Sequence, residues 1–129
     1  MALRKAKQQG SGGYLWYSSA LAEELERSVR LQNQLQQALN HEQFELYYQP
    51  VVESRGQEVV GVEALLRWHH PEMGLLTPRD FLQAIESGGF MVEVTDWVLR
   101  QACSDIRCLS ESSGSPLWVS VNISPNHFL

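Results

Sequence analysis

The apolar residues at the start of the chain predict one long helix. Residues 18–41 repeat leucine and valine at helical spacing on an otherwise polar cylinder, and Ser18 or Ser19 stands where a helix cap is needed. The apolar stripe suits packing on the neighbouring domain, and it also suits a dimerising coiled coil. Because the heptad pattern is short and irregular, we favour packing on the neighbouring domain.

Residues 42–129 carry the pattern of an α/β domain. The stretches FELYYQPVV and VVGVEALLRW predict two strands around the turn SRGQ, and LWVSVNIS predicts a third. Between them, TPRDFLQAIESGG predicts a helix that begins at Thr77 and Pro78 and stops at Gly88 and Gly89. The stretch VEVTDWVLRQACSDIRCL predicts a second helix. The order strand, strand, helix, helix, strand predicts a sheet that is at least partly parallel.

Alternation along the predicted strands gathers polar side chains on one face. In VVGVEALLRW the apolar Val62 and Ala64 alternate with residues that point the other way. The polar residues that share this second face and lie late in their strands are Gln49, Glu63, Arg67, Asn122 and Ser124. In parallel sheets, chemistry gathers at the carboxyl ends of the strands, so these residues are candidates for a site.

Glu63 interrupts an apolar run, and a carboxylate in such a run needs a cation or a hydrogen-bonding partner. Carboxylate and amide oxygens suit Mg²⁺ or Mn²⁺, and an arginine beside them suits a phosphate, which it grips with two hydrogen bonds. From spacing alone, two interpretations stay open. One is a metal–phosphate site, and the other is a structural ion pair between Glu63 and Arg67.

The histidines are weaker candidates for a metal site. His69, His70 and Glu72 stand together in RWHHPEMG, but the proline that follows them predicts a surface turn. His41 and His127 are isolated, and we expect them to be structural or solvated.

Composition narrows the class of protein. The chain has 129 residues, a hydrophobic fraction of 43% and a net charge of −5, which fits one globular unit. All 15 acidic residues lie after residue 17, which argues against binding to a nucleic-acid polymer. No apolar run reaches the roughly 18 residues of a membrane span, and the start does not read as a signal peptide, so we expect a cytoplasmic location. Cys103 and Cys108 predict two buried thiols, with neither a disulfide framework nor zinc spacing.

Four motifs resemble the EAL family of cyclic di-GMP phosphodiesterases: YYQPVV, VGVEALLRWHHPEMGLLTPRDF, DWVLRQAC and WVSVNISP. The resemblance begins at about Glu42. Residues 1–17 resemble, over a short stretch, the closing helix and strand of a GGDEF diguanylate cyclase domain. The implied organisation is a GGDEF-like tail at 1–17, a linker helix at 18–41, and at 42–129 an EAL domain that stops after about three strands.

The resemblance implies a TIM-like (β/α)8 barrel that opens cyclic di-GMP to linear pGpG. In the family, the EAL glutamate and the VNIS asparagine bind Mg²⁺ or Mn²⁺. The glutamate matches Glu63 and the asparagine matches Asn122, and Glu63 is also the position implied to be catalytic. The ligand contacts match Gln49, Leu65 and Arg67. Because a TIM barrel takes about 250 residues, we expect the intact parent to be the active homodimeric enzyme and these 129 residues to be inactive alone.

Two other functions remain open. One is an inactive EAL module that binds cyclic di-GMP or relays signals through dimer contacts. The other is an interaction piece that uses helix 18–41 and is completed by a second chain. A parent attached to the inner membrane by segments outside these residues is compatible with each of these functions.

Overall fold

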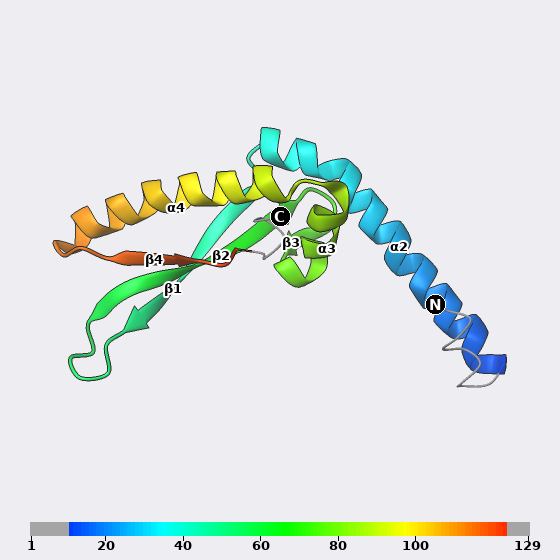
Figure 1. The fold of residues 1–129 in the computed structure, drawn as a ribbon, viewed down its shortest axis with the longest axis horizontal. Helices are drawn as coiled ribbons and strands as arrows, with labels where there is room; N and C mark the ends of the chain where they lie inside the picture. Colours follow the sequence, from blue (N-terminus) through cyan, green and yellow to red (C-terminus); the bar gives the residue numbers. More distant parts are fainter. Residues whose placement is uncertain (1–10, 124–129) are drawn as a thin grey trace.

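The computed structural model describes residues 11–123, with side chains from Ser19 onward, and confirms the predicted α/β class. Helices and strands follow one another as in Figure 1. In chain order they are α2 (Ser11–Asn40), β1 (Phe44–Val52), β2 (Val59–His70), β3 (Gly74–Leu76), α3 (Pro78–Gly88), α4 (Met91–Ser113) and β4 (Trp118–Val121). The short strand β3 was not predicted.

The strand β2 lies in the middle of a four-stranded sheet. Along one edge it pairs with β1 in an antiparallel hairpin, as the turn SRGQ predicted. Its other edge is shared by two partners: β4 runs parallel to residues 61–64, and β3 runs antiparallel to residues 68–70. The parallel β2–β4 pair confirms the predicted parallel part of the sheet. Because β2 touches all three other strands, its side chains are central to both faces.

Helix α2 begins at Ser11, seven residues before the predicted start, so the prediction that Ser18 or Ser19 caps it is wrong. Residues 14–19 contain neither glycine nor proline, and nothing there interrupts the helical hydrogen bonds. Residues 11–17 are helical, while residues 1–10 lie outside the described residues. Within residues 11–123, no helix combines the length and apolar character needed to cross a membrane.

The second half of α2 packs on the rest of the domain. This agrees with the first use proposed for its apolar stripe, which was packing on the neighbouring domain. Leu31, Leu35 and Ala38 are fully buried in the common core. The earlier part of the helix projects away from the sheet (Figure 1), and Leu25 and Val29, which precede the buried leucines, are more than half exposed. One helix thus changes from a core element to a projecting arm along its length.

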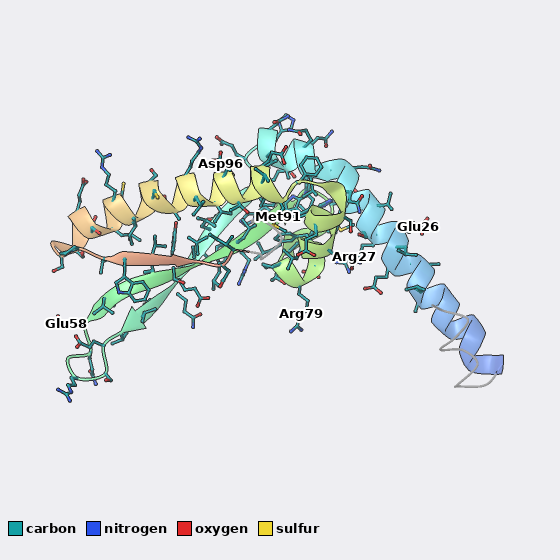
Figure 2. The ribbon with its side chains drawn as sticks, viewed as in Figure 1. Glu26, Arg27, Glu58, Arg79, Met91 and Asp96 are labelled. Carbon is teal, nitrogen blue, oxygen red and sulfur yellow. The ribbon has the colours of Figure 1, made fainter. Side chains whose placement is uncertain are left out.

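Two ion pairs fix α2 to neighbouring elements. Arg27, labelled in Figure 2, lies 3.4 Å from Asp80 in the first turn of α3. Arg30 pairs with Glu72 in the turn after β2. Since these side chains are largely exposed, each pair contributes at most about 1 kcal/mol, and the buried leucines provide most of the attachment.

Trp68 of β2 is fully buried and forms the centre of the core. Its ring centroid lies 5.5 Å from that of Phe44 and 5.8 Å from that of Phe81. Helix α3 begins as predicted at Pro78, where Thr77 N–H donates to Asp80 Oδ2 at 3.0 Å, and it ends as predicted at Gly89. The φ of Gly89 is 75°, a left-handed conformation that glycine adopts without strain.

Tyr48 attaches α4 to the edge strand β1. Its hydroxyl donates to Asp105 Oδ2 at 2.6 Å. Burial raises the pKa of Tyr48, and the hydrogen bond to Asp105 and the negative charge of that carboxylate raise it further. The tyrosine therefore stays protonated and acts as a hydrogen-bond donor between the strand and the helix.

Two sequence predictions about buried and exposed residues are wrong. Cys103 and Cys108 are exposed, because α4 turns Val98 and Ala102 toward the core and the thiols away from it. His70 is buried, only 3% exposed, although a surface turn was predicted. It is tolerated there because both ring nitrogens have partners: Nδ1 accepts from the backbone N–H groups of Glu72 and Met73, and Nε2 contacts Gln34 Oε1.

Candidate functional site

Two predicted site residues and Ser120 form one row across three strands of the sheet. Gln49 of β1 pairs directly with Glu63 of β2, and Glu63 pairs in turn with Ser120 of β4. Directly paired residues project from the same face of a sheet. The row therefore presents an amide, a carboxylate and a hydroxyl side by side, with Glu63 in the middle.

Asn122 follows β4 and contacts Glu63 across the strand boundary. Asn122 Nδ2 donates to Glu63 Oε1 at 3.2 Å, so the two residues predicted to bind a metal do meet. Glu63 is half-buried, and not buried as the apolar run suggested. Its sequence neighbours Val62 and Ala64 are 6% and 4% exposed on the opposite, core-facing side.

Arg67 lies on the same face as Glu63 but does not pair with it. No ion pair joins the two among the described residues, so the structural alternative to a metal site is not formed. Arg67 Nη1 donates to its neighbour Leu66 O at 2.8 Å, and Arg67 Cζ lies 5.6 Å from the centroid of the Tyr47 ring. The guanidinium is thus held against an aromatic ring on the site face.

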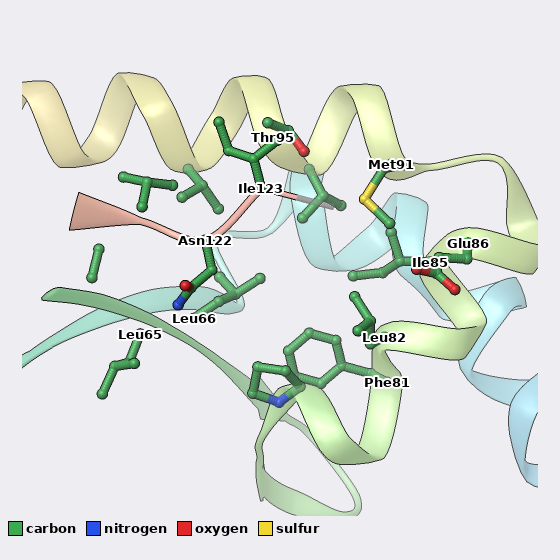
Figure 3. Close-up of a pocket in the computed structure, with 15 residues that line it drawn as sticks. Leu65, Leu66, Phe81, Leu82, Ile85, Glu86, Met91, Thr95, Asn122 and Ile123 are labelled. Atoms are coloured by element: carbon green, nitrogen blue, oxygen red, sulfur yellow. The ribbon is translucent and has the colours of Figure 1, made fainter. Parts of the chain in front are cut away.

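Leu65 borders an apolar cavity of about 390 Å³ between the sheet and helices α3 and α4 (Figure 3). Asn122 and Ile123 lie at the same margin, while Phe81 and Ile85 form part of the helical wall. The polar candidates Gln49, Glu63 and Arg67 do not line it. The cavity and the polar row are therefore two separate features that meet only near the end of β4.

The donors that meet in the row fit part of a divalent-metal site. Glu63 offers carboxylate oxygens and Asn122 an amide oxygen, which are the ligand types that Mg²⁺ and Mn²⁺ prefer. Within residues 11–123, no group of three or more histidine, cysteine, aspartate or glutamate side chains could complete such a site. The predicted Ser124 and His127 lie outside the described residues.

Three further residues belong to this face. Glu45 and Tyr47 alternate with the buried Phe44 and Leu46 along β1, and His69 stands two residues after Arg67. The sequence had assigned His69 to a surface turn, but β2 continues through residue 70. Period-two alternation from Arg67 would have found His69, had the strand been extended past Trp68.

The EAL domain family matches residues 32–129 of this chain. Two proteins of Pseudomonas aeruginosa are similar to it. The bifunctional diguanylate cyclase/cyclic di-GMP phosphodiesterase MucR is 38% identical over 127 residues, covering 98% of this chain and 18% of MucR. The cyclic di-GMP phosphodiesterase NbdA is 38% identical over 122 residues, covering 95% of this chain and 16% of NbdA. The chain spans less than a fifth of each of these relatives.

Solved structures are similar to the chain as well. The phosphodiesterase of PaMucR in complex with c-di-GMP is 44% identical, with a TM-score of 0.67, over 74% of this chain and 38% of that one. The EAL enzyme Bd1971, bound to cAMP and cyclic di-GMP, is 31% identical, with a TM-score of 0.70, over 97% of this chain and 32% of that one.

Proposed function

The chain belongs to the EAL domain family, and we propose that the whole protein containing it is a metal-dependent phosphodiesterase that opens cyclic di-GMP to linear pGpG. The observation that carries the proposal is the 3.2 Å contact between Asn122 and Glu63, in the row that also holds Gln49. The names of MucR and NbdA, and the c-di-GMP complex of PaMucR, support the same substrate.

We assign Glu63 and Asn122 to the metal, and Gln49, Leu65 and Arg67 to the ligand. Mg²⁺ is commonly held by one or two carboxylates together with substrate phosphates and water, so two protein oxygens from this segment are a reasonable share of the site. When bound, Mg²⁺ or Mn²⁺ would activate water and neutralise charge that develops on the phosphate. Arg67 would orient that phosphate through two parallel hydrogen bonds, and the Gln49 amide would fix the ligand beside Glu63.

We propose that the 129 residues alone do not catalyse this reaction. Glu63 and Asn122 are the two residues of the described segment that we assign to the metal, and a hydrolytic site needs further metal ligands and catalytic groups. The test compares this chain with the longer protein, each incubated with cyclic di-GMP and Mg²⁺ or Mn²⁺ and analysed for linear product. Linear product is expected from the longer protein and not from the 129-residue chain. Product from the isolated 129 residues at a comparable rate would reject this part of the proposal.

A second candidate function is ligand binding or signal relay without hydrolysis. It is favoured by two contacts that attach α2 to the end of β2 and the turn after it. Gln34 of α2 contacts the ring of His70, and Arg30 of α2 forms an ion pair with Glu72. Movement of the helix would reach the strand that carries Glu63. Calorimetry with cyclic di-GMP separates the candidates: a longer protein that binds the dinucleotide but forms no pGpG with either metal is a binding module.

Residues 1–17 we assign to the end of a GGDEF-like domain in the parent protein. The match to MucR supports this, since it covers 98% of this chain and MucR is named as a bifunctional cyclase and phosphodiesterase. Reading the parent sequence upstream of residue 1 tests the assignment. A cyclase-like domain is expected there, and an unrelated sequence would refute it.

We also propose that the parent is a homodimer. Leu25 and Val29 stand four residues apart on α2 with 56% and 54% of their surface exposed, which leaves apolar area available to a second copy. The molar mass of the longer protein by light scattering tests this. A dimer that dissociates on Leu25→Glu is expected, and a monomeric wild type would refute it.

A further inference from the structure

Arg67 has a negatively charged cross-strand neighbour with which it forms no ion pair. In the β1–β2 register, Arg67 stands directly opposite Glu45. Side chains at such positions are close enough to interact, and opposite charges there attract. Yet Arg67 belongs to none of the ion pairs formed by residues 11–123.

His69 holds the Glu45 carboxylate instead. His69 Nε2 contacts Glu45 Oε2, a diagonal contact across the same two strands. Because a carboxylate only accepts hydrogen bonds, Nε2 must carry the proton, and it can do so in the neutral or the charged imidazole. The histidine and the carboxylate are each about half exposed, so the contact is accessible to exchange with competing partners.

Tyr47 stands one row further along the sheet, opposite Leu65, and its ring is close to both Arg67 and His69. Its ring centroid is 5.6 Å from Arg67 Cζ and 6.4 Å from the centroid of the His69 ring. The guanidinium therefore has an aromatic face on one side and one hydrogen bond to Leu66 O, while a guanidinium has five N–H donors in all. Among residues 19–123, Leu66 O is the one hydrogen-bond acceptor of this guanidinium, so most of its donors are unused.

We propose that His69 is a positioning residue: by holding Glu45 it prevents a cross-strand ion pair with Arg67, and so leaves the Arg67 guanidinium, supported by the Tyr47 ring, ready to grip a phosphate of the ligand. The choice of a phosphodiester ligand rests on the function proposed above. Without His69, the Glu45 carboxylate would turn to Arg67 and compete with the phosphate for the same donors.

The first test measures cyclic di-GMP affinity of the longer protein by calorimetry in a chelator, so that no turnover occurs. His69→Ala should weaken binding about two- to fivefold, the range expected for one exposed cross-strand pair. Glu45→Gln in the His69→Ala background should restore the wild-type affinity, because the competing charge is gone. A histidine that serves only local structure would leave the double variant as weak as the single one, and that result would overturn the proposal. His41→Ala, in the exposed turn before β1, is the matched control.

The Tyr47 ring is tested by conservative rescue. Tyr47→Phe keeps the aromatic face and should bind as the wild type does, while Tyr47→Ser should bind about two- to fivefold more weakly. Circular dichroism of each variant verifies folding. Equal affinities for the phenylalanine and serine variants would remove Tyr47 from the arrangement.

A second readout uses the 129-residue chain and does not depend on the substrate. The Nε–Hε signal of Arg67 is followed by NMR, with inorganic pyrophosphate as the phosphate probe. His69→Ala should move the signal of the free chain and weaken the response to pyrophosphate, and added Glu45→Gln should reverse both effects. If the longer protein does not bind cyclic di-GMP while the Arg67 signal still shifts as described, the proposed function fails and the role of His69 stands. If His69→Ala leaves the Arg67 signal unmoved, the positioning role fails.

Discussion

Asn122 and Glu63, 59 residues apart in the chain, meet through a hydrogen bond of 3.2 Å between Asn122 Nδ2 and Glu63 Oε1. The contact follows from the parallel pairing of β4 with β2, which places Ser120 beside Glu63 and lets the chain carry Asn122 on past it. A carboxylate and an amide from different strands are thereby joined on one face.

Glu63→Gln in the longer protein should reduce pGpG formation by at least about 100-fold, because it removes the carboxylate proposed to bind the metal. Initial rates with Mg²⁺, followed by separation of the nucleotides, measure the loss. Glu58→Gln is the matched control, since Glu58 lies at the far end of the β1–β2 hairpin (Figure 2) and should leave the rate unchanged. Near-normal turnover by Glu63→Gln would remove Glu63 from the metal site.

Gly61→Ala should destabilise the sheet by about 1–3 kcal/mol, because a Cβ at this position would lie 2.2 Å from Cδ2 of the Trp118 ring. Urea unfolding of the 129-residue chain measures the change, and tryptophan fluorescence reports displacement of the ring. Gly56→Ala is the control, since its Cβ would meet no atom closer than Glu58 Cγ at 3.9 Å. Adding Trp118→Ala should relieve the clash, and a double variant no better than the sum of its parts would contradict this explanation.

His70 should make the domain less stable in mild acid. Burial lowers the pKa of His70 below its ordinary 6.5, with smaller and opposing effects of Glu72, which raises it, and Arg30, which lowers it. The folded state therefore binds its proton less readily than the unfolded chain does. The stabilisation is complete above about pH 6.5 and is lost as pH falls through the lower pKa of the folded state.

Urea unfolding at several pH values between 7.5 and 5 measures this dependence. Besides the cost of burying its charge, protonation of His70 would remove the hydrogen bonds that Nδ1 accepts from the N–H groups of Glu72 and Met73. His70→Gln should lower stability at pH 7.5 and flatten the dependence on pH, whereas His41→Ala should keep the wild-type slope. An unaltered slope in His70→Gln would assign the acid sensitivity to other groups.

Leu35→Ala should lower the free energy of unfolding by about 2–5 kcal/mol, because Leu35 is fully buried between α2 and the rest of the core. Leu25→Ala, on the projecting half of the same helix, should change it by no more than about 0.5 kcal/mol. Chemical denaturation of the two variants gives the comparison. Similar values for both would mean that α2 does not contribute its second half to the core in solution.

Much of the fold could be predicted because the decisive signals are local. Alternation in VVGVEALLRW identified β2 and the face that carries Glu63, and Thr77 with Pro78 identified the start of α3. The errors about burial have one cause in common. Whether Cys103 or His70 is buried depends on which neighbours cover it, and a sequence period gives a face without saying what lies against that face.

Side-chain alternation and the signals for the start of α3 are properties of a few consecutive residues, so the order of amino acids was enough to identify which residues share a strand face. Which faces meet depends on the three-dimensional fold. It brought Asn122 to Glu63, left Arg67 without an ion pair while Glu45 went to His69, and divided α2 into a buried half and a projecting half. Those outcomes depend on strand register and packing between distant segments, where competing partners are separated by small differences in free energy.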